Sequence, residues 1–176
     1  ADKVAAAALG IWDQARRTGS PRNTSFILLE LGGAFTAAIA VEGGAIVDGI
    51  GGTGGPPGWQ SGGAWDGAVA FLAGAVTKEM LFRGGAETAP DGMAAYVEGA
   101  EKAVRALTAA VRAPGEILLS GRKAARPEIR EALAARLDAF APGWRSEPRP
   151  DGPSGLRLRL LHREDDGLAF ELVSSE

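Results

Sequence analysis

Residues 25–58 read SFILLELGGAFTAAIAVEGGAIVDGIGGTGGPPG and contain three apolar segments separated by paired glycines. The first segment, Ser25 to Leu31, has apolar residues on both sides of an extended chain, which predicts a strand buried on both faces. Phe35 to Val41 and Ala45 to Ile50 follow after glycine pairs, and glycine supplies the positive φ angles that tight hairpin turns need. The stretch therefore predicts a three-stranded antiparallel meander.

The composition is that of an ordinary globular domain. The chain has 176 residues, of which 45% are hydrophobic and 23% are charged, and its formal net charge is −3. This length can bury a substantial core, and the weak charge gives no general attraction to nucleic acid or anionic membranes. The chain has no cysteine, which excludes disulfides and cysteine-ligated metals and agrees with a cytoplasmic location. No run of about twenty apolar residues predicts a membrane span, and we expect no secretion signal.

Helical and strand patterns alternate in the rest of the chain. The first helix, Ala1 to Arg17, has Val4, Ala8, Ile11 or Trp12, and Ala15 at spacings of three and four residues. A strand is expected at Glu116 to Gly121, and LRLRLLHREDDGLAFELV, which starts at residue 156, predicts a hairpin. This order predicts an α/β fold with a mixed sheet covered by helices on both faces. The further expected helices are Ala64 to Gly74 with Trp65, Ala68, Val69 and Leu72 on one face, Asp91 (as N-cap) to Arg112, and Pro127 to Phe140.

The glycines invite two interpretations. Residues Gly49 to Gly54 match GxGxxG, but they follow a third strand and lead into Pro56 and Pro57, so a dinucleotide-binding Rossmann site has little support. Bare peptide amides at the ends of neighbouring strands suit contact with an anion such as phosphate. The alternative is that these glycines only form tight turns and a surface loop. The residues alone leave both interpretations open.

Several side chains also have two interpretations. Asp66 lies just inside a predicted helix start, where it either stabilises the helix dipole or takes part in catalysis. Glu30 ends a buried strand and is either paired with a cation or faces a cleft. Trp59 either packs the glycine-proline loop or stacks on a ligand. His162 is the only histidine, so neither a catalytic triad nor a histidine metal site is supported, and we predict no protein metal centre.

The order of these motifs resembles the carboxyl-terminal lobe of the superfamily that unites acetate and sugar kinases, actin and the heat-shock chaperones. The likeness covers roughly Ala1 to Phe140 and is greatest to the predicted butyrate kinases. It implies a ribonuclease-H-like lobe over residues 1–145, with 146–176 as a loop and hairpin of the same domain, and it implies ATP and Mg²⁺ as cofactors. By this resemblance we assign phosphate binding to Gly32, Gly33, Thr36, Gly51, Gly52, Thr53 and Gly54, adenosine binding to Ser120, Gly121 and Arg122, and catalysis to Asp66.

The departures from the superfamily pattern bear on function. Nothing in the chain matches the amino-terminal lobe that supplies half of the nucleotide cleft, and Gln60 stands where acetate kinases have an arginine. We therefore expect the ATP-binding lobe of a small-molecule kinase, with a carboxylate or sugar acceptor, that needs an amino-terminal lobe for catalysis. The expected partners are a nucleotide, that lobe and a second copy of the chain, with no nucleic acid or membrane. The alternative is a noncatalytic scaffold or oligomerisation domain; a dinucleotide-binding protein ranks third.

Overall fold

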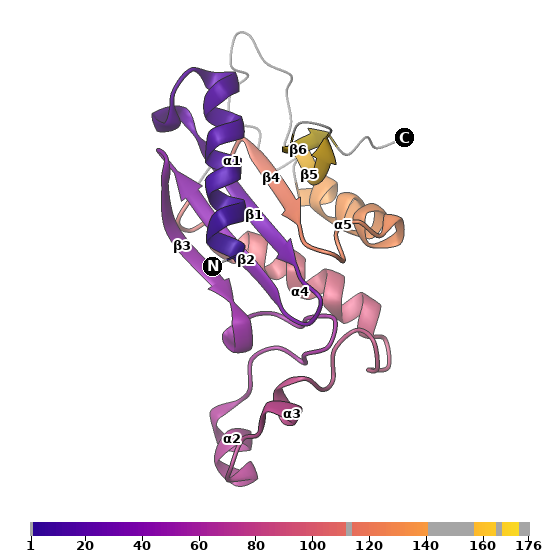
Figure 1. The fold of residues 1–176 in the computed structure, drawn as a ribbon. Coiled ribbons are helices and arrows are strands. Elements are labelled where there is room, and N and C mark those ends of the chain that lie inside the picture. The colour runs from indigo at the N-terminus through magenta and orange to yellow at the C-terminus, as the bar shows by residue number, and fades with distance from the viewer. Residues whose placement is uncertain (1, 112–113, 141–156, 165–166, 173–176) are drawn as a thin grey trace.

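The computed structural model describes residues 2–111, 114–140, 157–164 and 167–172 of the chain (Figure 1). A six-stranded sheet with the order β3-β2-β1-β4-β5-β6 forms its centre. β1 runs parallel to β4 and β4 runs parallel to β5, whereas the other neighbours are antiparallel, so the predicted mixed sheet is confirmed. The strands are β1 (Ser25–Leu31), β2 (Thr36–Glu42), β3 (Ala45–Gly51), β4 (Glu116–Ser120), β5 (Arg157–Glu164) and β6 (Gly167–Leu172).

The two turns of the β1-β2-β3 meander use glycine for different reasons. Gly43 and Gly44, between β2 and β3, have φ angles of 61° and 84°, as a tight hairpin turn requires. Gly32 and Gly33, between β1 and β2, do not have positive φ angles, so that part of the prediction is wrong. A Cβ atom at Gly32 would lie 2.8 Å from the carbonyl oxygen of Phe35, which accepts a hydrogen bond from the Gly32 amide. Close backbone approach is therefore the reason for glycine at residue 32.

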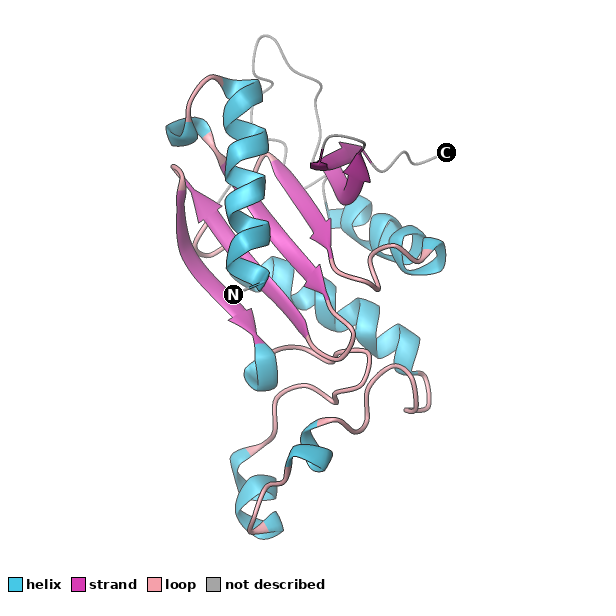
Figure 2. Cartoon of the chain, in the orientation of Figure 1, coloured by secondary structure: helices cyan, strands magenta, loops and turns pink. Residues whose placement is uncertain are grey.

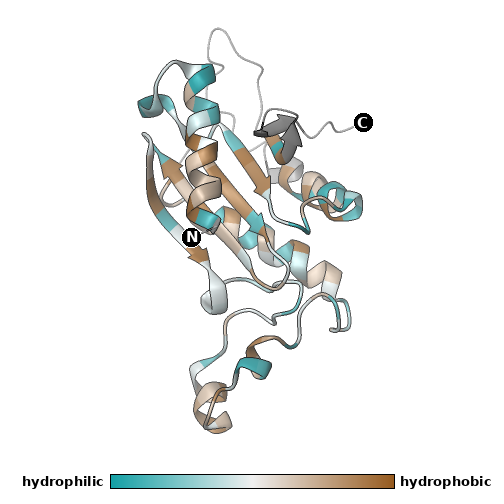
Figure 3. Ribbon diagram, in the orientation of Figure 1, coloured by the Kyte–Doolittle hydropathy of each residue, from teal (hydrophilic) through white to brown (hydrophobic). Residues whose placement is uncertain are grey.

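Helices cover both faces of the sheet (Figure 1). α1 (Asp2–Thr18) lies on one face, where Phe26, Leu28 and Leu118 form a small core. α4 (Gly92–Leu107) and α5 (Pro127–Phe140) cover the other face, where Ile27 and Leu29 belong to the larger core. Alternate residues of β1 thus face opposite cores, which confirms the predicted burial of this strand on both sides. The hydropathy colouring of Figure 3 shows the same concentration of hydrophobic residues in β1 and β4.

The buried side of α1 differs from the predicted apolar stripe. Val4 and Trp12 are 58% and 52% exposed, whereas Ala7, Gly10 and Gln14 are buried. A Cβ atom at Gly10 would lie 2.7 Å from Leu118 and 2.8 Å from Phe26. At Gly10 the helix therefore approaches the sheet closely, because a larger side chain there would hold the two apart.

Residues 52–91, between β3 and α4, form a segment that extends beyond the end of the sheet (Figure 2). It contains η2 (Gly52–Gly54), α2 (Gly67–Ala73) and α3 (Lys78–Leu81). The predicted helix Ala64 to Gly74 is shorter than expected, and its apolar face does not reach the core, since Leu72 is 81% exposed. Periodicity indicates that a helix has an apolar face, but it does not determine what that face contacts.

The α4 and α5 helices agree closely with the sequence patterns. Asp91 precedes α4 as predicted, but it has a φ angle of 52° and its side chain makes no capping hydrogen bond. α4 ends at Leu107 rather than Arg112, and turns follow to residue 110. α5 has the predicted bounds, and Ile129 and Leu133 are fully buried. No helix among the described residues combines the length and apolar character that crossing a bilayer requires.

The β5 and β6 strands extend the sheet beyond β4. β5 pairs with β4 in parallel, and β6 returns antiparallel beside β5. Arg159 of β5 forms ion pairs with Asp13 of α1 and with Glu116 of β4. The carboxyl-terminal strands are therefore tied to the first helix. The loop expected at 146–155 lies outside the described residues.

Candidate functional site

The carboxyl ends of the parallel strands β1 and β4 lie side by side. Glu30 of β1 is in register with Ser120 of β4, and each strand then enters a glycine turn. In open α/β sheets, ligands bind outside the carboxyl ends of parallel strands, because loops from neighbouring strands converge there. A binding site is therefore expected at this edge of the sheet.

A pocket of about 510 Å³ opens at this edge. The β1-β2 turn contributes the pocket residues Gly33 and Ala34, and the loop after β4 contributes Arg122, Lys123 and Arg126. Gln60, from the segment after β3, completes the lining. Its backbone N–H donates a hydrogen bond to the Ala34 carbonyl oxygen at 3.1 Å. Three cations and no carboxylate line the pocket, so its electrostatic potential favours anions.

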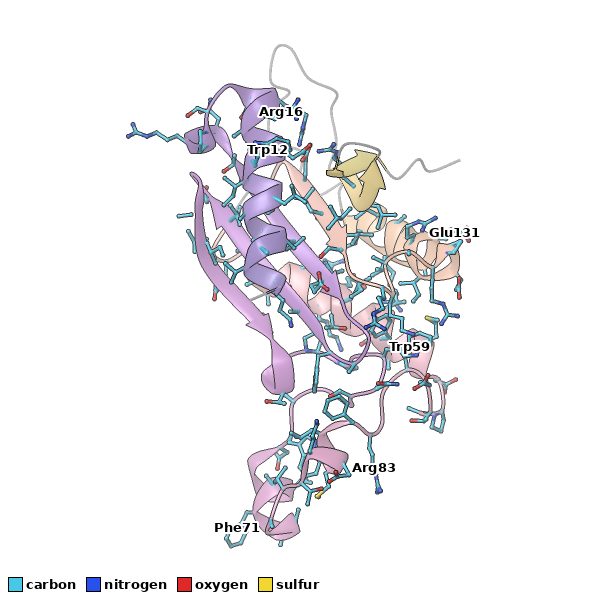
Figure 4. The ribbon with its side chains drawn as sticks, viewed as in Figure 1. Trp12, Arg16, Trp59, Phe71, Arg83 and Glu131 are labelled. Atoms are coloured by element: carbon cyan, nitrogen blue, oxygen red, sulfur yellow. The ribbon has the colours of Figure 1, made fainter. Side chains whose placement is uncertain are left out.

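Trp59 lies against two of these cations. The Lys123 Nζ atom is 4.0 Å from the centre of the indole ring, and the Arg126 guanidinium carbon is 4.5 Å from it. Figure 4 shows Trp59 near the loop that follows β4. Both distances lie within the range in which a cation is attracted to the face of an aromatic ring. The pocket cations are therefore supported by an aromatic side chain as well as by their own loop.

The Trp59 ring is itself held in place. Its Nε1 atom donates a hydrogen bond to Glu87 at 3.2 Å, and the side chain of Gln60 donates another to the same carboxylate at 3.0 Å. These hydrogen bonds from Gln60 and Trp59, with the nearby charge of Lys123, lower the pKa of Glu87 below its usual value. The ring of Tyr96 meets Trp59 edge-on, with the ring centres 5.9 Å apart. Trp59 is only 8% exposed.

Contacts between β1 and the loop after β4 set the position of the basic residues. The Ser120 hydroxyl donates a hydrogen bond to the Glu30 carboxylate, and the Lys123 amide donates one to the Leu31 carbonyl oxygen at 3.0 Å. Gly121 has a φ angle of 92°, and a Cβ atom there would lie 2.4 Å from the same oxygen. Glycine is therefore required where the chain leaves β4, and Glu30 serves to join the two strand ends.

Two buried hydroxyl groups lie near the β1-β2 turn. The Thr36 Oγ1 and Tyr96 Oη atoms are buried, and neither has a hydrogen-bond partner of good geometry among the described residues. Burial raises the pKa of Tyr96 to about 12, an effect that the neighbouring Thr36 hydroxyl reduces and the Glu30 charge increases. Thr36, to which the resemblance assigns phosphate binding, is fully buried and is not among the residues that line the pocket.

The second predicted phosphate loop lies at the same end of the sheet as the first. Gly51 is in register with Ala37, near the start of β2, and Gly55 packs closely on the Thr36 carbonyl oxygen. The pocket nevertheless includes Gly33 and none of the loop residues Gly51, Gly52, Thr53 and Gly54. Of the predicted adenosine-binding residues, Arg122 lines the pocket, whereas Ser120 and Gly121 shape the turn that leads to it.

Asp66 lies away from this pocket. It precedes α2, and its Oδ1 atom accepts hydrogen bonds from the amides of Ala68 at 2.8 Å and Val69 at 3.2 Å. The carboxylate therefore caps a short exposed helix. A group of three or more His, Cys, Asp or Glu side chains suited to a metal is absent from the described residues. Mg²⁺ prefers carboxylate and phosphate oxygens, so the cationic pocket lining does not fit this ion, although it fits phosphate.

Sequence reasoning missed Lys123, Arg126 and Ala34 as pocket residues. One signal was present: the segment GRKAAR, residues 121–126, places three cations directly after a buried strand that ends in glycine. The part played by Trp59 had no such signal. It depends on residues 58–60 folding back beside residues 85–87, through hydrogen bonds such as that from the Glu87 amide to the Trp59 carbonyl oxygen at 3.0 Å.

The mixed sheet with helices on both faces belongs to the class of α/β folds similar to the lobes of acetate kinase, the actin-like ATPase fold. Within that class, the chain belongs to a family described as "Protein of unknown function (DUF1464)", whose model matches residues 1–158. A comparison with curated proteins found no match. The resemblance to predicted butyrate kinases therefore stays a prediction.

Three solved structures illustrate the fold. Acetate kinase from Entamoeba histolytica has a TM-score of 0.65 and 11% identity, over 87% of this chain and 52% of that one. Acetate kinase from Porphyromonas gingivalis has a TM-score of 0.65 and 15% identity, over 87% and 50%. A propionate kinase from Francisella tularensis subsp. tularensis SCHU S4 has a TM-score of 0.64 and 12% identity, over 87% and 50%. The chain thus spans about half the length of the solved structures it matches.

Proposed function

We propose that this lobe binds the phosphate chain of ATP in the pocket between the β1-β2 turn and the loop after β4. The observation that carries the proposal is the convergence of Arg122, Lys123 and Arg126 on one open pocket whose other lining includes Gly33. A Cβ atom at Gly33 would meet nothing within 4 Å, so the bare backbone there leaves room for a phosphate group. Arginine suits phosphate because its planar guanidinium donates paired hydrogen bonds.

We further propose that the lobe is the nucleotide-binding half of a small-molecule kinase. The three solved structures described above are acetate and propionate kinases, which favours a carboxylate acceptor, with a sugar as the alternative. Phosphoryl transfer requires groups that orient the nucleophile and stabilise charge on the transferred group. The pocket lining supplies cations for the second task but no carboxylate for the first. Catalysis would therefore need a second, amino-terminal lobe across the pocket.

A noncatalytic scaffold is the second candidate function. It is favoured by the exposed apolar tip, which we define as Val69, Phe71, Leu72 and Val76, with exposures from 45% to 83%. Apolar residues gathered at the end of a protruding segment are typical of contact surfaces. This role and nucleotide binding are compatible, because the tip and the pocket share no residue.

The test is ATP binding by isothermal titration calorimetry, with and without Mg²⁺. We expect Arg122→Ala and Lys123→Ala each to weaken binding about tenfold, the scale of one charge-assisted hydrogen bond. Arg22→Ala is the matched control, since Arg22 is an exposed arginine in the 3-10 helix before β1, Pro21–Asn23, and should bind ATP as the parent does. We expect Mg²⁺ not to tighten binding, because the pocket has no carboxylate for it. If the parent protein binds no ATP, the noncatalytic scaffold is the remaining candidate function.

A further inference from the structure

We propose that Trp59 is a positioning residue for the phosphate site: its ring holds Lys123 and Arg126 in the conformation that receives the anion. The inference rests on the proposed function, because it assigns a role within that pocket. Trp59 itself is not among the residues that line the pocket. It acts through the two cations that do, which lie 4.0 Å and 4.5 Å from its ring centre.

The physical reason is conformational entropy. Lysine and arginine side chains have many rotamers, and this conformational freedom is lost when they are fixed on a ligand. Tryptophan is the aromatic side chain that attracts cations most strongly, and the attraction is greater when the contact is desolvated. A ring that already holds both cations reduces the entropy lost on binding, which is the general advantage of a preorganised site.

The direction of the effect follows from where the cations lie. Lys123 and Arg126 line the pocket while they contact Trp59, so the stacked conformation is also the one that faces the ligand. Weakening the ring's attraction should therefore weaken anion binding. If stacking instead withdrew the cations from the pocket, weakening the attraction would strengthen binding. The sign of the change thus separates a positioning role from a competing one.

The two cations should depend on Trp59 to different degrees. Arg126 also hydrogen-bonds to Glu128 through its Nε atom at 2.7 Å, so a carboxylate helps to hold it. Lys123 lies near Glu87, whose carboxylate is engaged by Trp59 and Gln60. We therefore expect the larger part of the effect to act through Lys123.

The ring is rigid enough to serve as a support. The Trp59 Nε1–H donates a hydrogen bond to Glu87, and the rings of Trp59 and Tyr96 meet edge to face. Trp59 also belongs to the larger hydrophobic core. Movement of a side chain with these restraints would require repacking of the core. The support therefore persists whether or not an anion is bound.

Fluorinated tryptophan at residue 59 tests the proposal without changing the shape of the core. Fluorine atoms withdraw electron density from the ring face and weaken its attraction for cations. We expect the Kd for ATP to rise stepwise with one, two and three fluorines, by about threefold to tenfold in total, with only a small fall in the midpoint of urea unfolding as the ring's attraction for the two cations weakens. In the Lys123→Ala background the same series should give a smaller rise.

Trp12 provides the matched control, because the Arg16 guanidinium carbon lies 4.6 Å from its ring centre, and neither residue lines the pocket. Fluorination at Trp12 should leave the Kd for ATP unchanged. If the Kd stays flat or falls across the Trp59 series, the positioning role is wrong. ATP binding, and with it the proposed function, would still hold. Absence of ATP binding by the unmodified protein would instead reject the proposed function.

Discussion

The Glu116 carboxylate at the start of β4 lies 2.7 Å from the Arg17 guanidinium in the last turn of α1, and both carboxylate oxygens accept a hydrogen bond. The Glu116 side chain is fully buried, whereas that of Arg17 is 36% exposed. Burial opposes the charge on Arg17, but hydrogen bonding to Glu116 and attraction to it raise the Arg17 pKa above its usual value. This pair joins the first helix to a central strand 99 residues away.

Arg17→Ala should lower the free energy of unfolding by about 2 kcal/mol, less than the about 3–5 kcal/mol typical of a fully buried pair, because Arg17 is partly solvated. Arg159, 3.8 Å from Glu116, should compensate in part. Urea unfolding followed by circular dichroism measures the change. Arg16→Ala is the control and should cost less than about 1 kcal/mol, since Arg16 lies over the exposed ring of Trp12. Equal losses for both variants would contradict a special role for the Glu116 pair.

Replacing leucine with alanine should lower the free energy of unfolding strongly in the core and very little at the exposed tip. Leu133→Ala should cost about 2–5 kcal/mol, because Leu133 is fully buried and its loss leaves a cavity. Leu72→Ala should change the free energy of unfolding by less than about 0.5 kcal/mol, because Leu72 is 81% exposed. Chemical denaturation of both variants gives the comparison. A large loss for Leu72→Ala would mean that the tip is covered in solution.

Two glycines at the pocket should respond differently to alanine. Gly121→Ala should cost at least about 2 kcal/mol, because its φ angle is 92° and the new Cβ would overlap the Leu31 carbonyl oxygen. Gly33→Ala should leave the thermal unfolding midpoint nearly unchanged, because its φ angle is not positive and a Cβ there meets nothing within 4 Å. Differential scanning calorimetry distinguishes the two. Similar midpoints for both variants would refute the described path of the loop after β4.

Tyr96 is the only tyrosine, so its ionisation can be followed by absorbance alone. Burial raises its pKa from 10.0 to about 12 in the folded protein. A raised pKa means that the folded state holds the proton longer than the unfolded state, so this stabilising contribution is complete below pH 10 and is lost as the pH rises from about 10 to about 12. We expect tyrosinate absorbance to appear near pH 12 in the folded protein and near pH 10 in urea. Tyr96→Phe should lose less stability over this interval than the parent.

The strands and helices that were well predicted are those whose local patterns agree with their surroundings. β1 and α5 have the predicted bounds, because a short apolar segment between turn residues favours a buried strand and a proline-initiated amphipathic pattern favours a helix. The stripe on α1 was predicted wrongly because hydropathy takes no account of side-chain size. Gly10 faces the sheet because any side chain there would overlap Phe26 and Leu118, which belong to other elements.

The residues of the candidate site were likewise predicted only in part. The glycine turn at residues 32–33 and Arg122 were predicted by resemblance, and they lie at or in the pocket. Lys123 and Arg126 were not predicted, although they are in the same short segment as Arg122. Asp66 was assigned to catalysis by resemblance, whereas in the structure it caps α2 and does not line the pocket.

The sequence by itself determined the α/β class, the meander and the two helices of the larger core, because these depend on the period of apolar residues and on turns formed within a few positions. Only the tertiary structure decided that β4 lies beside β1, that Trp59 supports Lys123, and that α2 lies apart from the core. Each of these features depends on which residues distant in the chain come into contact. Packing and charge in three dimensions decide those contacts, and local periodicity carries no information about them.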